Sequence, residues 1–144
     1  MHPFPHQYTV VAAARPDGDV PLSVPGARVI ESAPPKEFDG PGNQWSPEQL
    51  LTAAVADCFV LGFRAIASAS KFRWLDLQAS TRGTLDKVQG IMRFTRFETH
   101  AKLHVPAGTE LERAKRLLEK AESSCPVANS LSSERHLSME IVES

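Results

Sequence analysis

Cys58 and Cys125 are the only two cysteines among the 144 residues of this chain, and their thiols are its strongest candidates for chemistry. If the two thiols meet in the folded protein, one thiolate can attack an oxidant and become a sulfenic acid. The other can then condense with it to a disulfide. The alternative is that both are small apolar core residues. The sequence leaves both readings open, because a contact between residues 67 positions apart is not visible in it.

A reactive thiolate requires a nearby cation or a helix N-terminus. Cys58 is expected in the middle of a helix and has Asp57 beside it, so the cation must come from elsewhere. Arg64 follows six residues later, which is about 600° around a helix and therefore on a different face. Arg15 and Arg28 lie in or near predicted loops that could fold over the thiol. Solvated surface charge is the alternative for each of them.

The histidines do not predict a metal site. His100 and His104 are four apart on a predicted strand, which separates them by about 13 Å, too far to chelate one ion. His2 and His6 lie close to the N-terminus. Two thiols alone are also too few for a structural zinc site, so we expect no metal.

Length and composition are typical of one globular domain over residues 1–144. Apolar residues make up 42% of the chain and charged residues 23%, and the net charge of -1 provides no basic surface for nucleic acid. The first ten residues lack the basic start and apolar run of a secretion signal, so we expect a cytoplasmic protein. In a reducing compartment, a disulfide is more often catalytic than structural.

The apolar run over residues 50–67 has about the length of a membrane span. It contains Asp57 and Arg64, and a charge costs about 2.5–3.5 kcal/mol at the centre of a bilayer. We therefore predict a helix buried between protein layers and no membrane association. Ser46 as N-cap, Pro47 at the first position and Gln49 in a capping box predict that this helix starts at Pro47 and runs to about Ser70.

The remaining segments predict strands and a second helix. Alternating apolar residues indicate strands over residues 7–14, 20–24, 28–30, 74–85, 92–105 and 136–142, with a bulge near Thr95 that restores the phase. Thr109 and Glu112 predict a capping box for a second helix, which should end near Ser124 because Pro126 disfavours helical geometry before it. The predicted fold class is α+β, with a long buried helix and a shorter one packed against an antiparallel sheet.

Two segments resemble the signature motifs of the OsmC/Ohr family, which comprises organic hydroperoxide reductases and osmotically inducible proteins. The first is WSPEQLLTAAVADCF, in which Cys58 follows Glu48 by ten residues. The second is SSCPVANSL, in which Cys125 begins a Cys-Pro-x-Ala-Asn pattern ending at Asn129. The order of strands and helices also matches, so the resemblance covers essentially the whole chain.

The resemblance implies roles for four residues. Cys58 would be the peroxidatic cysteine and Cys125 the resolving one, while Glu48 would orient an arginine that polarises the thiolate and the peroxide. Arg15, in the segment ARPDG, occupies the place of that arginine in the hydroperoxide-reductase branch. The osmotically inducible branch has its arginine just before the catalytic helix, where this chain has Lys36 instead. Which of these cations serves Cys58 stays open.

The resemblance also implies antiparallel sheets wrapped around central helices in an intertwined homodimer without a bound cofactor. Ten helical residues span about 15 Å, so Glu48 cannot directly approach Cys58 of its own chain. Glu48 must then come from a second subunit or act through another side chain that reaches across, and the spacing favours a site shared across a dimer interface. The leading hypothesis is a peroxidase for organic hydroperoxides, recycled by a small-molecule or lipoyl-type dithiol. The alternative is a small-molecule-binding or stress-related relative that kept the fold and has weak or no peroxidase activity.

Overall fold

The computed structural model describes residues 1–144, which divide into two compact units, residues 1–50 and 51–144. Each unit is described by itself below. The boundary falls inside the first long helix, α1 (Pro47–Ala69). The assignment of the whole chain to one domain stays a prediction.

The N-terminal unit contains a three-stranded antiparallel sheet. Its strands follow the order β1 (Val11–Ala12), β2 (Val20–Ser23) and β3 (Ile30–Ser32), and a single 3-10 turn, η1 (Lys36–Phe38), lies beyond them. All three strands were predicted, but β1 is much shorter than the expected strand over residues 7–14. Its partner β2 offers only four residues for pairing, one of which is a proline without an N–H group.

Helix α1 begins as the sequence predicts. The backbone N–H of Gln49 donates to Ser46 Oγ (3.1 Å), and the backbone N–H of Ser46 donates to Gln49 Oε1 (3.0 Å), which confirms the capping box. The prediction that α1 is buried between protein layers holds for only one of its faces in the single chain. Its buried residues, Val55, Phe59, Phe63 and Ala67, form one face at intervals of four, and Leu61 on another face is 47% exposed.

The second unit contains a three-stranded sheet in the order β4 (Asp76–Val88), β5 (Ile91–Val105) and β6 (Glu134–Glu143). Strands β4 and β5 form an antiparallel hairpin. Thr84 pairs with Arg96 and Leu85 pairs with Phe94, which leaves Thr95 as the extra residue and confirms the predicted bulge.

The expectation of a wholly antiparallel sheet is corrected by β6, which runs parallel to β5. Helix α2 (Leu111–Ser123) lies between these two strands in the chain. A helix inserted between two neighbouring strands carries the chain back along the sheet, so the second strand starts at the same end as the first. The α+β class itself is confirmed.

The second capping box is also corrected. The N-cap of α2 is Glu110 and makes no side-chain capping bond, while the Thr109 hydroxyl donates to the Pro106 carbonyl (2.6 Å). The hydroxyl therefore closes the turn before the helix instead of capping it. Helix α2 ends at Ser123, as the proline at 126 predicts, and a four-residue helix, α3 (Pro126–Asn129), follows.

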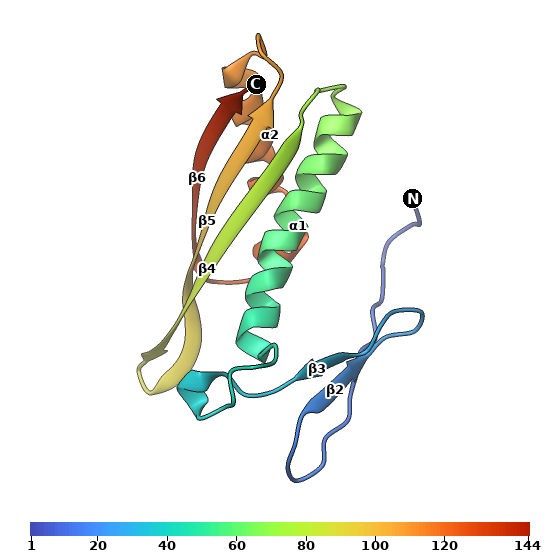
Figure 1. The fold of residues 1–144 in the computed structure, drawn as a ribbon, viewed down its shortest axis with the longest axis vertical. Helices are drawn as coiled ribbons and strands as arrows, with labels where there is room; N and C mark the ends of the chain where they lie inside the picture. Colours follow the sequence, from blue (N-terminus) through green and yellow to red (C-terminus); the bar gives the residue numbers. More distant parts are fainter. The chain divides into compact units, whose positions relative to one another are not determined.

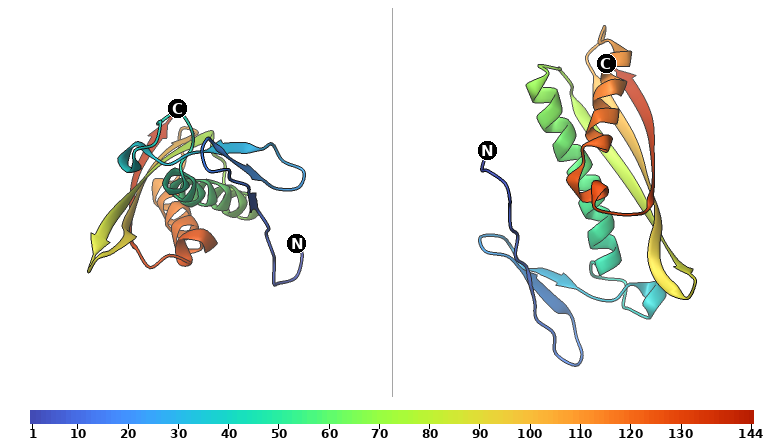
Figure 2. Two further views of the ribbon diagram at one scale, coloured as in Figure 1. Left: turned by 90° about the horizontal axis from the view of Figure 1, so that it is seen from below. Right: turned by 180° about the vertical axis from the view of Figure 1, so that it is seen from behind.

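Helices α1 and α2 cover one face of the second sheet and leave the other face open (Figure 1). The view from behind shows the same two layers (Figure 2). Side chains from α1, α2 and β5 form one core between the layers. Its fully buried members are Phe59, Phe63, Ala67, Ala101, Leu103, Val105, Ala114, Leu118 and Ala121. This core holds the helices at fixed positions on the sheet and thereby positions the two cysteines.

Candidate active site

Cys58 lies in the middle of α1, one residue before the buried Phe59. Its side chain is half-buried, on the face of α1 that also carries Ala54 and Gly62. These small residues one turn before and after it leave space beside the thiol. Position 58 is therefore anchored by the core on one side and accessible on the other.

Cys125 occupies the corner between α2 and α3 and is 2% exposed. It is the N-cap of α3, and its sulfur accepts a hydrogen bond from the backbone N–H of Ala128 (3.5 Å). Pro126 follows at the first position of that helix, where a proline is favoured because its missing N–H would be unpaired anyway. Pro126 thus follows the end of α2, as the sequence predicts, and also marks the start of α3, which was not predicted from the sequence.

The structure brings the two predicted cysteines together. Both are free thiols, and the Cys58 side chain lies within hydrogen-bonding range of Cys125. The pKa of the Cys125 thiol is raised to about 11, first by burial and then by the hydrogen bond with Cys58, against the lowering effects of the Ala128 and Val127 backbone N–H groups. Cys125 is therefore protonated at neutral pH. A thiol pair in contact is able to form a disulfide if an oxidant acts on one member.

The two thiols open onto a hollow of about 480 Å³ on the surface of the second unit. It is lined by Ala54, Asp57, Cys58, Leu61, Gly62, Ser124, Cys125, Pro126 and Val127. The lining is mainly apolar, and Asp57 is its one charged member. An apolar hollow beside a thiol favours an organic ligand over a small polar one.

The arginine predicted to activate Cys58 is not among the lining residues. Arg64 is exposed and lies off the Cys58 face of α1, as the helical spacing predicts. Arg15 lies in the exposed loop between β1 and β2, and Arg28 and Lys36 are also exposed. These three residues belong to the N-terminal unit. Their relation to the thiols stays a prediction.

Glu48 lies in the first turn of α1. The helix is continuous from Pro47 to Ala69, so the ten residues between Glu48 and Cys58 correspond to about 15 Å along its axis. The predicted role of Glu48 in orienting an arginine stays a prediction.

Sequence reasoning missed Arg135, which lies near the start of β6. Its guanidinium donates to Glu122 Oε1 (2.8 Å), to the Glu122 carbonyl and to Asn129 Oδ1 (2.6 Å). These contacts join β6 to both helices that flank Cys125. Asn129 stands in the signature motif, but no pattern in the sequence links it to an arginine six residues later.

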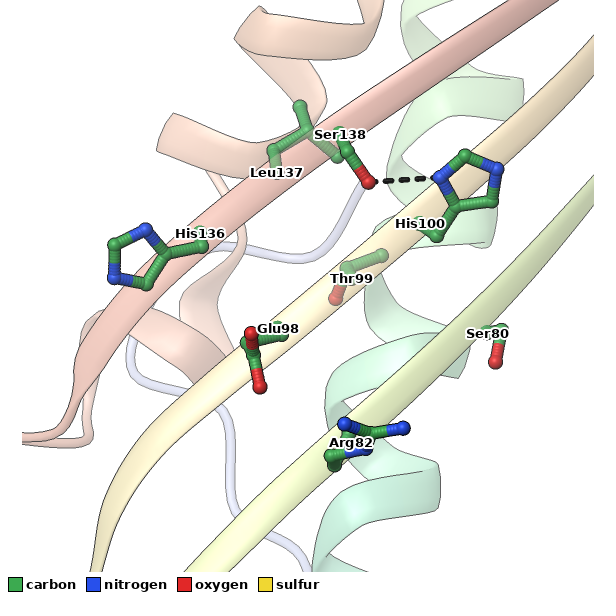
Figure 3. Close-up of a pocket in the computed structure, with 8 residues that line it drawn as sticks. All are labelled: Ser80, Arg82, Glu98, Thr99, His100, His136, Leu137 and Ser138. Atoms are coloured by element: carbon green, nitrogen blue, oxygen red, sulfur yellow. Dashed lines mark hydrogen bonds between the residues drawn. The ribbon is translucent and has the colours of Figure 1, made fainter.

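The three histidines of the second unit, His100, His104 and His136, lie on the open face of the second sheet and not among the residues that line the thiol hollow. His100 Nδ1 is 2.7 Å from Ser138 Oγ, and His104 Nδ1 is 2.6 Å from Asp76 Oδ1. Figure 3 shows the shallow hollow of about 460 Å³ on this face, with side chains from all three strands around it. No group of three or more His, Cys, Asp or Glu side chains is placed where it could hold a metal ion.

Helix α1 is long and apolar enough to cross a membrane by length and composition alone. One such helix is weak evidence for a membrane span, because the core helix of a globular protein can have the same length and composition. Here the face formed by Val55, Phe59, Phe63 and Ala67 is buried within the protein.

Solved structures with the same fold include an OsmC-like protein and an organic hydroperoxide resistance protein. An OsmC-like protein from Vibrio cholerae superposes with a TM-score of 0.84 at 16% identity, covering 93% of this chain and 99% of that one. An organic hydroperoxide resistance protein from Legionella pneumophila has a TM-score of 0.71 at 23% identity, covering 95% and 97%. At these identities the likeness shows the fold alone.

Sequence comparison also finds relatives of this chain and its family. The protein YmaD of Bacillus subtilis is 26% identical over 125 residues, which cover 85% of this chain and 83% of YmaD. The family model described as OsmC-like protein matches residues 40–140, a range that includes both cysteines, both helices beside them and most of the second sheet. With that match over more than half of its length, the chain belongs to the OsmC-like protein family.

Proposed function

We propose that this protein is a thiol-dependent peroxidase that reduces organic hydroperoxides. The observation that carries the proposal is the contact between Cys58 and Cys125 beside a largely apolar hollow. The name of the Legionella pneumophila neighbour, an organic hydroperoxide resistance protein, points in the same direction. Cys58, which is half-buried, would react with the peroxide, and the buried Cys125 would then react with the oxidised Cys58.

The first step transfers an oxygen atom to sulfur. The Cys58 thiolate attacks the terminal oxygen of the hydroperoxide, an S–O bond forms and the O–O bond breaks. The alkoxide leaves and takes up a proton as the alcohol, and Cys58 becomes a sulfenic acid. A cation beside the thiolate would stabilise the leaving oxygen, and Arg15 held by Glu48 is the proposed source.

The second step forms the disulfide. Cys125 attacks the Cys58 sulfur, an S–S bond forms, and the hydroxyl group leaves with the Cys125 proton as water. Because Cys125 is protonated at neutral pH, its proton must be lost as it attacks. A dithiol then reduces the disulfide by two exchange reactions and is itself oxidised to a cyclic disulfide. A dithiol of the lipoyl type or a small-molecule dithiol fits this step.

The proposed assembly is a cytoplasmic homodimer. In the single chain, α1 leaves a second apolar face uncovered around Leu61, which a second copy would bury. A shared site would also let Glu48 of one chain serve the thiol of another.

A second candidate function is the binding of small apolar molecules without chemistry. The observation that favours it is that Asp57, and no cation, lines the hollow beside Cys58. A carboxylate there offers no positive charge to stabilise a leaving alkoxide, whereas it does not prevent an apolar ligand from binding.

The test is single-turnover reduction of cumene hydroperoxide by the pre-reduced protein. Consumption of one equivalent of peroxide, with formation of the Cys58–Cys125 disulfide, is the expected result. Cys58→Ser should abolish peroxide consumption. In Cys125→Ser the reaction should stop at the Cys58 sulfenic acid, which dimedone traps. Undiminished peroxide consumption by Cys58→Ser, or none by the wild type, would reject the peroxidase and favour the binding protein.

A further inference from the structure

Arg135 joins three elements around the second cysteine. It lies on β6 and is bound to the Glu122 side chain on α2 and to the Asn129 side chain on α3. The Arg135 and Glu122 side chains are 27% and 18% exposed, so this ion pair is largely shielded from solvent. Arg135 lies outside the hollow and takes no part in the steps described above.

Two of these contacts lead directly to Cys125. The carbonyl of Glu122 accepts a hydrogen bond from the Arg135 guanidinium and also one from the backbone N–H of Cys125 (3.4 Å). Asn129, held by Arg135, donates from its side chain to the Ser123 carbonyl (3.2 Å), and its backbone N–H donates to the Cys125 carbonyl (2.9 Å). The guanidinium therefore fixes the residues on both sides of Cys125.

The corner that carries Cys125 needs such support. Helix α3 has only four residues, too few to be stable by its own hydrogen bonds. A disulfide, in contrast, forms only within narrow limits, with a Cβ–S–S–Cβ angle near ±90° and Cα atoms within about 7 Å. Small displacements of the corner therefore translate into a poorly placed Cys125 sulfur.

We propose that Arg135 is a positioning residue for the second step of the reaction, the attack of Cys125 on the oxidised Cys58. It acts through Glu122 and Asn129, which hold the corner between α2 and α3. This inference rests on the proposed function. It assigns Arg135 no role in the first step, because none of its contacts reaches Cys58.

The experiment separates the two steps by stopped-flow kinetics and dimedone trapping in the full-length protein. Arg135→Gln removes the charge, and Arg135→Lys keeps the charge but cannot bind Glu122 and Asn129 in the same fork geometry. Arg116→Gln is the matched control, since Arg116 is an exposed arginine on α2 in a loose pair with Glu110 (3.6 Å).

We expect sulfenic acid to form in Arg135→Gln within about twofold of the wild-type rate, and its conversion to the disulfide to slow about tenfold or more. The rate of disulfide formation in Arg135→Lys should lie between those of Arg135→Gln and the wild type, and the rate in Arg116→Gln should equal that of the wild type. Unchanged conversion, or equal slowing of both steps, would overturn the inference. Arg135→Lys carries the test if Arg135→Gln does not fold.

A glutathione redox titration distinguishes failure of this inference from failure of the proposed function. It measures how readily the two thiols form a disulfide without any peroxide. If the wild type does not react with peroxide, the peroxidase is rejected. A Cys58–Cys125 disulfide that is about tenfold less favoured in Arg135→Lys than in Arg116→Gln would still support the positioning role. Equal titrations would reject it.

Discussion

The surroundings of Cys125 act on its proton in opposite directions. Two backbone N–H groups at the start of α3 favour the thiolate, whereas burial and the Cys58 side chain favour the thiol. Burial is the largest of these effects, and together they raise the pKa of Cys125 from 9.0 to about 11. Cys125 is therefore protonated at neutral pH and a poor nucleophile, which suits its proposed role as the thiol that reacts second.

This shift predicts a stability that depends on alkaline pH. The folded state holds the Cys125 proton more tightly than the unfolded state, so the contribution is complete below about pH 9 and is lost as the pH rises towards 11. In urea unfolding of the reduced protein, the free energy of unfolding should fall between about pH 8 and pH 11. This fall should exceed the one in Cys125→Ser by about 2 kcal/mol.

Serine is the matched replacement because its hydroxyl does not titrate in this range and can accept the Ala128 N–H. Equal pH dependence in both proteins would contradict the raised pKa of Cys125.

At the scale of the elements, Gly83 allows the start of α1 to lie close against β4. A Cβ atom at this position would be 2.8 Å from the Thr52 hydroxyl on α1 and 2.7 Å from the Phe97 ring on β5. The Phe97 ring is stacked on Phe94 with centroids 5.1 Å apart and has little room to move. The glycine therefore sets the distance between the helix and the sheet that together carry the core.

Gly83→Ala should lower the free energy of unfolding by about 1–3 kcal/mol, because the added methyl group forces apart atoms that are already in contact. Gly62→Ala on α1 is the control. Nothing in the chain lies within 4 Å of its added methyl, so the gain in helix propensity should leave stability equal or raise it by up to about 1 kcal/mol. Similar urea midpoints for both variants would argue against a tight approach of α1 to β4.

At the scale of the whole molecule, apolar side chains remain exposed in both units. They include Val10, Val11, Val29 and Ile30 in the N-terminal unit and Leu61 in the second. Exposed apolar surfaces of this kind commonly mark an interface. The proposed homodimer accounts for them, and it would also complete the thiol site if Glu48 and Arg15 reach it from the partner.

Light scattering after size exclusion should give the mass of a dimer for the wild type. Leu61→Glu should shift the protein towards the monomer, because it places a charge on the face of α1 that a second copy would bury. Leu111→Glu serves as the control, since a carboxylate at the first residue of α2 is compatible with the helix N-terminus. A monomeric wild type, or a dimer unaffected by Leu61→Glu, would reject this interface.

Local patterns were sufficient for much of the fold. The capping box at Ser46, the bulge at Thr95 and the strand over residues 136–142 are all present as predicted. Each depends on neighbouring residues along the chain. The predicted capping box at Thr109 is wrong because a hydroxyl can bind the preceding turn equally well. The predicted antiparallel direction of β6 is wrong because the alternation of apolar residues is the same in parallel and antiparallel strands.

By itself the sequence determined which residues are the candidates for chemistry, Cys58 and Cys125, because their types and motifs are local properties. Only the tertiary structure decided that the two thiols meet, that burial raises the pKa of Cys125, and that Arg135 secures its corner. Each of these depends on distances between segments that are far apart in the chain. Such distances are set by the packing of α1, α2 and β6 around the core.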